Sequence, residues 1–349
     1  MSADDFSLSC PLPLRHDTIQ LAHGGGGRVM RELLERVLLP ALGNPALDRR
    51  HDSALVELGG ARLAFTTDTY VVHPRFFPGG DIGKLAVFGT VNDLAMAGAT
   101  PRCLSLGLIL EEGYPIEELR RVVESIRAAA QLCGVAIVTG DTKVVDRGKG
   151  DGIFINTAGI GLVPAGVELG PHKVRAGDAV IVSGDLGRHG IAVMSQRENL
   201  GFQTLIESDC APLHDLVAAL LTDGLDIHCL RDPTRGGLAS VLNEIATDGK
   251  LSIETLETFI PVDESVSAAC EILGLDPLYV ACEGRMVVFL PEAQADRALE
   301  RLRATPGGAG AARIGAVHAE DPGLVVLRTA LGTQRILDLL SGEQLPRIC

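Results

Sequence analysis

Apolar residues along the chain alternate between helical spacing and short strand-like runs. In the first half, helical spacing predicts helices over 29–39, 82–97 and 115–133. Short apolar runs between them predict strands at 19–22, 53–58, 61–66, 103–110, 135–138 and 153–162. Because strands and helices alternate, the first half is expected to form one α/β unit.

The pattern restarts after residues 164–178, which are rich in glycine and proline and lack periodicity. The second half predicts a strand at 179–183, a glycine-rich turn with a helix after it, helices at 212–222, 236–247, 263–273 and 292–304, and strands at 279–281, 286–290, 313–317 and 324–327. The expected fold is therefore α/β (or α+β) with two domains. Their bounds are 18–165 and 175–337, between a loose extension at 1–17 and a mobile tail at 338–349.

Composition narrows the class of protein. The length of 349 residues suits about two domains, and 46% apolar residues exclude a disordered chain. With 31 Lys and Arg against 45 Asp and Glu, the net charge of −14 disfavours binding to nucleic acid or to an anionic membrane. The acidic surplus suits a protein that holds divalent cations, although ordinary solubility explains it equally well.

The sequence also suggests a compartment. No stretch approaches the roughly 20 apolar residues that span a bilayer, and the N-terminus is acidic where a signal peptide would be basic. We therefore expect a cytoplasmic protein whose 8 cysteines are mostly buried free thiols, since none forms a C-x-x-C pair. Cys349 is the exception, because the last residue of a chain is not expected to have a core to bury it.

Four consecutive glycines follow the first predicted strand: Gly24, Gly25, Gly26 and Gly27. Glycines let backbone N–H groups approach an anion, and a helix N-terminus adds partial positive charge, so this segment is a candidate phosphate loop. It matches neither G-x-x-x-x-G-K-[ST] nor G-x-G-x-x-G. A flexible turn is the alternative interpretation.

Four carboxylates stand beside small or apolar residues: Asp52, Asp68, Asp93 and Asp232. Asp93 is the most informative, because it lies in a predicted helix of Val, Leu, Ala and Met. A buried carboxylate needs a partner, and hard divalent cations take carboxylate oxygens. Singly, each residue is explained by a helix cap or a turn. Together they favour a magnesium–nucleotide site.

Three further positions are candidates for catalysis. An apolar strand is predicted to end in a glycine turn that carries Asp141 and Lys143, where the lysine would bind phosphate or simply lie exposed. Glu283 follows the predicted strand 279–281 and either faces a cleft or pairs with Arg285. Cys349 places a thiol at the chain end, where it is able to act as a nucleophile and carry an adduct.

Several motifs resemble one family closely. They are the run from Phe65 to Gly113, GDTKVV at 140–145, INTAGIG at 155–161, RDPTRGGLA at 231–239 and the terminal PRIC. The resemblance extends from about Thr18 to Cys349 and is to the HypE family, the carbamoyl dehydratases of [NiFe]-hydrogenase maturation, within the AIR synthetase-like ATP-binding superfamily. The sequence departs from that family in its N-terminal extension and in a fourth glycine at 24–27, where serine is common.

The resemblance implies an AIR synthetase-like fold that forms a homodimer through its N-terminal sheets. It implies that ATP and Mg²⁺ bind at the glycine segment and at Asp52, Asp68, Asp93 and Asp232. Partners would be the carbamoyltransferase HypF, which loads Cys349, and a HypC–HypD complex that accepts cyanide. Lys143 and Glu283 would lie near the terminal cysteine. Neighbouring positions expected to complete the nucleotide site are Thr67, Asn92, Thr139, Gly140 and Asp141.

The chemistry expected from this resemblance is ATP-dependent dehydration of an S-carbamoyl group on Cys349 to a thiocyanate. Glu283 is the first candidate for the base and Asp141 the second. We expect the tail to fold between the domains and bring Cys349 close to Lys143. Two other functions remain open: an ATP-dependent synthetase or kinase with a free small substrate, and a scaffold without catalysis whose tail is gripped by partners.

Overall fold

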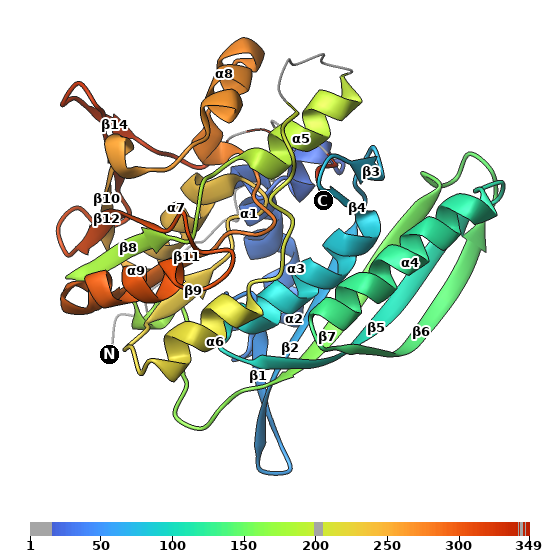
Figure 1. The fold of residues 1–349 in the computed structure, drawn as a ribbon, viewed down its shortest axis with the longest axis horizontal. Coiled ribbons are helices and arrows are strands. Elements are labelled where there is room, and N and C mark those ends of the chain that lie inside the picture. The colour runs from blue at the N-terminus through green and yellow to red at the C-terminus, as the bar shows by residue number, and fades with distance from the viewer. Residues whose placement is uncertain (1–15, 199–204, 341, 343–344, 346) are drawn as a thin grey trace, which may run out of the picture.

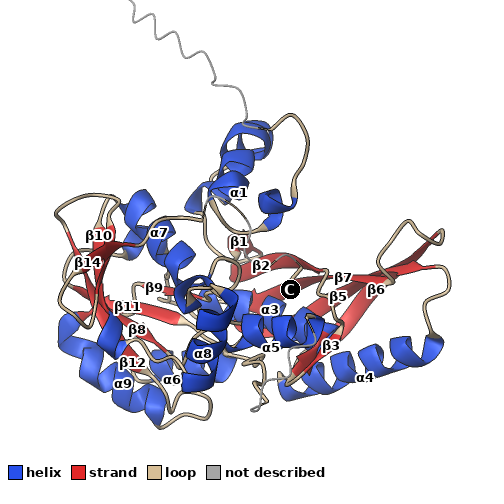
Figure 2. Ribbon diagram, turned by 90° about the horizontal axis from the view of Figure 1, so that it is seen from above, coloured by secondary structure: helices blue, strands red, loops and turns tan. Residues whose placement is uncertain are grey.

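The computed structural model describes residues 16–198, 205–340, 342, 345 and 347–349. Two sheets lie side by side, each with helices against it (Figure 1). The C-terminus lies in the middle of the molecule, between the two sheets, where Figure 2 shows it again. In the described part of the chain, no helix is both long and apolar enough to cross a bilayer.

The first sheet has five strands in the order β1-β2-β7-β5-β6, and only β5 and β6 are parallel. Helices α3 (Ile82–Met96) and α4 (Ile116–Leu132) cover one of its faces. Asp81 caps α3 by accepting hydrogen bonds from two backbone N–H groups of its first turn. The strands are β1 (Ala54–Leu58), β2 (Ala61–Tyr70), β5 (Thr100–Glu111), β6 (Ala136–Val145) and β7 (Ile153–Leu162).

The second sheet has seven strands in the order β14-β13-β10-β12-β8-β11-β9. They are β8 (Asp178–Val182), β9 (Cys229–Arg231), β10 (Ser252–Leu256), β11 (Val287–Pro291), β12 (Ala312–His318), β13 (Val325–Arg328) and β14 (Gln334–Ile336). Strand β8, which lies between β12 and β11, is completely buried. The helices of this half are α5 (Arg188–Arg197), α6 (His214–Thr222), α7 (Gly237–Gly249), α8 (Glu264–Leu273) and α9 (Ala295–Arg303).

The glycine segment leads into a helical stretch that lies above the first sheet (Figure 2). This stretch is built from α1 (Arg28–Leu33), the π-helical turn η2 (Leu34–Leu38) and α2 (Leu39–Leu42). A two-residue hairpin, β3 (Phe76–Phe77) with β4 (Gly80–Asp81), precedes α3. The remaining short helices are η1 (Leu21–Gly24), η3 (Leu47–Arg49), η4 (Pro171–Lys173), η5 (Glu257–Phe259), η6 (Pro277–Tyr279) and η7 (Glu292–Gln294).

Several predicted elements are wrong. Residues 19–22 do not form a strand, because the chain there turns into η1. Residues 279–281 do not form one either, since Tyr279 ends η6 and 280–281 are irregular. Residues 139–143 are not a turn, since β6 continues through them in parallel register with β5. Strands β9, β10 and β14 were not predicted. Of the expected extension at 1–17, residues 1–15 lie outside the described part.

The expectation that Cys349 has no core to bury it is wrong. Cys349 is only 6% exposed, and Leu345 and Ile348 are buried with it in a core that the first half shares with helices α5 and α8. Further upstream, Leu340 accepts a hydrogen bond from the backbone N–H of Arg28 (2.8 Å). The described tail residues therefore have defined packing partners, and the terminal cysteine has a core after all. A short apolar segment can fill a gap between two domains that its own sequence does not reveal.

Candidate active site

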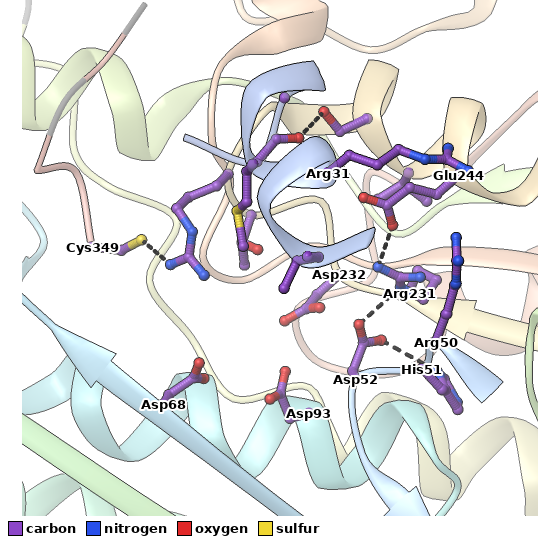
Figure 3. A pocket seen from close by; sticks show the side chains of 18 of the residues that line it. Arg31, Arg50, His51, Asp52, Asp68, Asp93, Arg231, Asp232, Glu244 and Cys349 are labelled. Carbon is purple, nitrogen blue, oxygen red and sulfur yellow. Dashed lines mark hydrogen bonds and ion pairs between the residues drawn. The ribbon is translucent and has the colours of Figure 1, made fainter. Parts of the chain in front are cut away.

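A cavity of about 410 Å³ lies between the two halves of the molecule. Its wall combines the glycine segment, a cluster of acidic side chains and the terminal cysteine. Figure 3 shows the carboxylates of Asp52, Asp68, Asp93 and Asp232 around one space, with Cys349 at its side. The four predicted aspartates, distant in sequence, are therefore brought together.

Three of these carboxylates form a compact group. Asp52 precedes β1, Asp93 projects from α3, and Asp232 follows β9. One ligand oxygen from each lies within 4.8 Å of the others. Asp68 projects from β2 beside them and accepts a hydrogen bond from the Tyr70 hydroxyl (3.1 Å). Oxygen atoms converging at this spacing suit a hard divalent cation.

Electrostatics supports a cation at this place. Burial raises the pKa of Asp93 well above its usual range, and the charges of Asp68, Asp232 and Asp52 raise it further. Burial, with repulsion from Asp52, also raises the pKa of Asp232 to about 8. The buried Oδ2 of Asp52 has no hydrogen-bond partner. Carboxylates crowded in this way repel one another unless a cation neutralises them, so the donor set fits Mg²⁺.

Arg231 orients one member of the group. Its Nε forms an ion pair with Asp52 Oδ1 (2.8 Å), and its Nη2 donates a hydrogen bond to Glu244 (2.8 Å). On the other side, Thr66 Oγ1 donates to Asp93 Oδ2 (2.7 Å). Side chains around the aspartates thus fix their rotamers before any ligand binds.

Cys349 is held at the edge of the same cavity. Nη1 of Arg235 donates a hydrogen bond to the Cys349 sulfur (3.1 Å). Burial nevertheless raises the pKa of the Cys349 thiol to about 12, and Arg235 offsets only part of this effect. The docked cysteine is therefore a neutral thiol. The guanidinium of Arg235 beside this thiol was not expected from the sequence.

The glycine segment packs against the backbone of Arg235 and against the backbone of the tail at Leu340. A Cβ on Gly26, whose φ is +72°, would lie 2.6 Å from the Arg235 carbonyl oxygen. A Cβ on Gly27 would lie 2.6 Å from the Leu340 carbonyl oxygen. Gly26 and Gly27 line the main cavity, whereas Gly24 and Gly25 line a smaller one on the other side of Cys349. The segment is therefore built for close approach of backbone, and only two of its glycines face the aspartates.

Glu283 lines the main cavity, as expected of a residue that faces a cleft. It does not pair with Arg285, whose guanidinium binds Asp185 (2.6 Å). Burial raises the pKa of Glu283 well above its usual range, and its buried Oε1 has no hydrogen-bond partner. A buried carboxyl with an unpaired oxygen, in the same cavity as the terminal thiol, is suited to proton transfer.

Two candidate residues lie near the cavity but do not face it. Asn92 is buried, and its amide holds the backbone at Ala211 (3.1 Å) and Leu213 (2.8 Å). Thr67 points away from the aspartates and donates to the Thr157 carbonyl (3.1 Å). In a strand, alternate residues share a face, so Thr66 and Asp68 face the cavity while Thr67 cannot.

The four candidate residues on strand β6 do not line the cavity of their own chain. They are Thr139, Gly140, Asp141 and Lys143. Lys143 binds Asp141 (2.7 Å), and their side chains are 70% and 71% exposed. Thr139 and Gly140 lie on the same exposed strand. None of the four lines either cavity described above, so the expected approach of Cys349 to Lys143 is not found within one chain.

Sequence reasoning missed the basic residues of the site. Arg231 and Arg235 both belong to the RDPTRGG motif, where only Asp232 was singled out. His51, whose Nδ1 lies 3.6 Å from Asp52 Oδ2, was also missed. The signal was available in part, because buried carboxylates require nearby cations.

Comparison with known proteins places the chain in a family. Residues 50–163 match the family described as AIR synthase related protein, N-terminal domain, and residues 175–327 match its C-terminal domain. Carbamoyl dehydratase HypE of Azotobacter vinelandii is 52% identical over 338 residues, which cover 97% of this chain and 99% of that protein. Carbamoyl dehydratase HypE of Escherichia coli K12 is 47% identical over 95% of this chain and 100% of its own length.

Solved structures of HypE proteins have the same fold as this chain. The crystal structure of the hydrogenase maturation protein HypE in complex with ATP superposes with a TM-score of 0.80 at 50% identity, covering 95% of this chain and 100% of that one. A HypE chain from the crystal structure of a HypE–HypF complex superposes with a TM-score of 0.84 at 47% identity, covering 88% of this chain and 99% of that one. The chain belongs to the HypE family of carbamoyl dehydratases, within the AIR synthase related proteins.

Proposed function

We propose that this protein is an ATP-dependent carbamoyl dehydratase of [NiFe]-hydrogenase maturation, which acts on an S-carbamoyl group carried by its own Cys349. The observation that carries the proposal is the position of that sulfur. It lies at the wall of the cavity that holds the aspartate cluster and makes a hydrogen bond with Arg235. A carrier cysteine and a candidate nucleotide site thus share one cavity.

The proposed reaction converts a poor leaving group into a good one. The carbonyl oxygen of the thiocarbamate takes the γ-phosphoryl group of ATP, and ADP leaves. The C–O bond then breaks as phosphate departs, both N–H protons are lost, and S–C≡N remains. The cavity contributes by holding the carbonyl oxygen in line with the phosphoryl group and by excluding water.

Asp52, Asp93 and Asp232, with Asp68 beside them, would hold Mg²⁺ together with the phosphates of ATP. When bound, this cation supplies charge neutralisation at the transferring phosphoryl group. Gly26 and Gly27 would bring backbone N–H groups to the phosphates, with Gly24 and Gly25 on the side of the cysteine. Asn92 would act as a positioning residue, because its amide donates to the Glu283 carbonyl oxygen and so fixes the backbone that carries Glu283.

Glu283 is the proposed base for the N–H protons. Its raised pKa makes its carboxylate, once formed, a stronger base than an ordinary glutamate. Arg235 would hold the sulfur in place while electrons shift toward nitrogen and oxygen. Asp141 is kept as a second candidate, with Lys143 as a group that stabilises negative charge.

We infer that Lys143 and Asp141 act in a second copy of the chain. The face of the first sheet opposite α3 and α4 carries exposed apolar residues. Phe65 and Ile160 are cross-strand partners on that face, and Ile109 pairs in register with Lys143. Pairing of two such faces in a homodimer would cover the apolar residues and move the β6 side chains toward a neighbouring molecule.

The proposed function also implies protein partners and a cytoplasmic location. A HypF-type carbamoyltransferase would load Cys349, and a HypC–HypD complex would take the cyano group. The net charge of −14 speaks against nucleic acid as a partner. The reducing cytoplasm suits a free terminal thiol.

Intact-mass measurement of the protein with the carbamoyltransferase and its substrates tests the function. We expect gain of one carbamoyl group on the C-terminal peptide, and then loss of the mass of one water when ATP is present. Cys349→Ala should gain neither. A carbamoyl group on Cys349→Ala, or turnover of a free small substrate by that variant, would overturn the proposal. A scaffold without catalysis predicts an adduct that never loses water.

A further inference from the structure

The last three residues of the chain are held by their main-chain oxygen atoms. The backbone N–H of Val71 donates to an oxygen of the Cys349 α-carboxylate, and that of His73 donates to the Arg347 carbonyl oxygen, both at 3.2 Å. These two bonds run in antiparallel register just beyond the end of β2. The first half of the molecule therefore binds the tail as an added strand segment.

The second half supplies the other donors from a single helix, α5. Nε2 of His189 lies 2.8 Å from the Ile348 carbonyl oxygen. Nη2 of Arg197 donates to the carbonyl oxygens of Arg347 (2.8 Å) and His73 (2.6 Å). We propose that His189 and Arg197 are positioning residues that fasten the docked tail to the second half of the molecule through its main chain.

The hydrogen-bond network fixes the tautomer of His189. The Ile348 carbonyl can only accept, so Nε2 carries the ring hydrogen and donates to it. Nδ1 of the neutral ring then accepts from the Ser208 hydroxyl (2.9 Å), whose oxygen accepts in turn from the backbone N–H of Cys210 (3.0 Å). Burial lowers the pKa of His189 to about 4, which keeps this arrangement neutral at physiological pH.

Filling the space around His189 would not require a side chain that donates a hydrogen bond. His189 is completely buried, and its ring lies edge-on to Phe77 at 5.3 Å between centroids. An aliphatic side chain would fill the same space but would leave the Ile348 carbonyl without a donor, which is costly in a buried site. A donor at the position of Nε2 is thus the property that distinguishes positioning from packing.

This inference goes beyond the proposed function, because it concerns where the tail rests and not the reaction. Each half of the molecule contributes donors to the same three residues, so docking of the tail also ties the halves together. The contacts are to backbone atoms, and their register places the sulfur at Arg235. Its test needs neither ATP nor a carbamoyl group, so failure of the proposed function would leave the result unaffected.

The test is alkylation of Cys349 by iodoacetamide in the full-length protein at neutral pH. Cleavage after Glu343 releases residues 344–349, in which mass spectrometry measures the modified cysteine. We expect His189→Leu to be alkylated about tenfold faster than the wild type, because an ordinary hydrogen bond shifts an equilibrium by about that factor. His189→Gln, which keeps a donor, should stay within about threefold. Arg197→Met should raise the rate of Cys349 alkylation by a similar factor.

Two controls separate local release from unfolding. Cys229 is completely buried in a separate core of the second half, and its alkylation should not change in these variants. His228→Leu removes another buried histidine hydrogen bond from the same half, to Asp178 (2.7 Å), and should leave Cys349 protected. Unchanged alkylation of Cys349 in both His189→Leu and Arg197→Met would overturn the proposal. Equal release in His189→Gln and His189→Leu, or a parallel rise at Cys229, would also overturn it.

Discussion

Arg235 and Cys349 are 114 residues apart in sequence, and a hydrogen bond of 3.1 Å joins the guanidinium of one to the sulfur of the other. The thiol is buried, so this cation is the polar group that accompanies it into the interior. A guanidinium favours negative charge on the sulfur or on a group attached to it. The relationship links the carrier residue to the motif that also supplies Asp232.

Replacement of Arg235 by Met should therefore impair dehydration more than loading. A lost charge-assisted hydrogen bond corresponds to roughly 10- to 100-fold in rate. The measurement is single-turnover loss of water from the carbamoylated protein, followed by intact mass. Loading by the carbamoyltransferase serves as the control and should stay near the wild-type rate. Dehydration by Arg235→Met at the wild-type rate would show that the hydrogen bond between Arg235 and Cys349 has no catalytic role.

Gly26→Ala should destabilise the protein and disturb the site. Its φ of +72° disfavours any Cβ, and the added atom would press on the Arg235 carbonyl at 2.6 Å. The expected loss is about 1–3 kcal/mol of unfolding free energy, measured by denaturant titration. Gly24→Ala is the matched control, because a Cβ there meets nothing within 4 Å. Equal effects of the two substitutions would contradict this assignment.

Asp93→Asn should separate metal binding from stability. Burial and three neighbouring carboxylates already favour the neutral form of Asp93, which asparagine imitates. We expect the metal-free protein to change by less than about 0.5 kcal/mol. The rise in melting temperature that Mg²⁺ gives the wild type should disappear. A variant that kept the full Mg²⁺ effect would exclude Asp93 as a ligand.

Asp178→Asn is the control for that experiment. Asp178 is buried as well, but it pairs with His228 far from the cavity. This variant should melt at a lower temperature and still gain stability from Mg²⁺. Together the two substitutions distinguish loss of a ligand from general loss of a buried carboxylate.

The thiol of Cys349 should respond to pH in a way that reports docking. Burial raises its pKa to about 12, compared with roughly 8.5 for a free thiol. Docking therefore favours the protonated thiol: its strength is constant below about pH 8.5 and weakens as pH rises from there toward 12. The rate of alkylation in the folded protein should keep rising through pH 10, whereas a synthetic peptide of residues 344–349 should level off. A plateau at the same pH in both would contradict the docked position.

How far the sequence reveals the site depends on the residue. Asp93 could be found because a lone carboxylate in an apolar helix has few explanations other than a ligand. His189 and Arg197 could not, since their partners are tail residues more than 100 positions away. Nothing in the local pattern of residues 345–349 says that they are buried. Tertiary packing also overrode the predicted turn at Gly140, where pairing with β5 extends the strand.

The most decisive prediction concerns Lys143, which is exposed on the uncovered face of the first sheet. If that face pairs with a second copy, Phe65→Glu should convert a dimer to a monomer in sedimentation and lower dehydration, because a buried unpaired charge opposes the interface. Lys143→Ala and Cys349→Ala should each be inactive alone. After the two proteins are mixed and allowed to exchange subunits, dehydration should reappear, since the intact tail of one chain then meets the Lys143 of the other. Mixtures that stay inactive although mixed dimers form would place Lys143 within its own chain or outside the reaction.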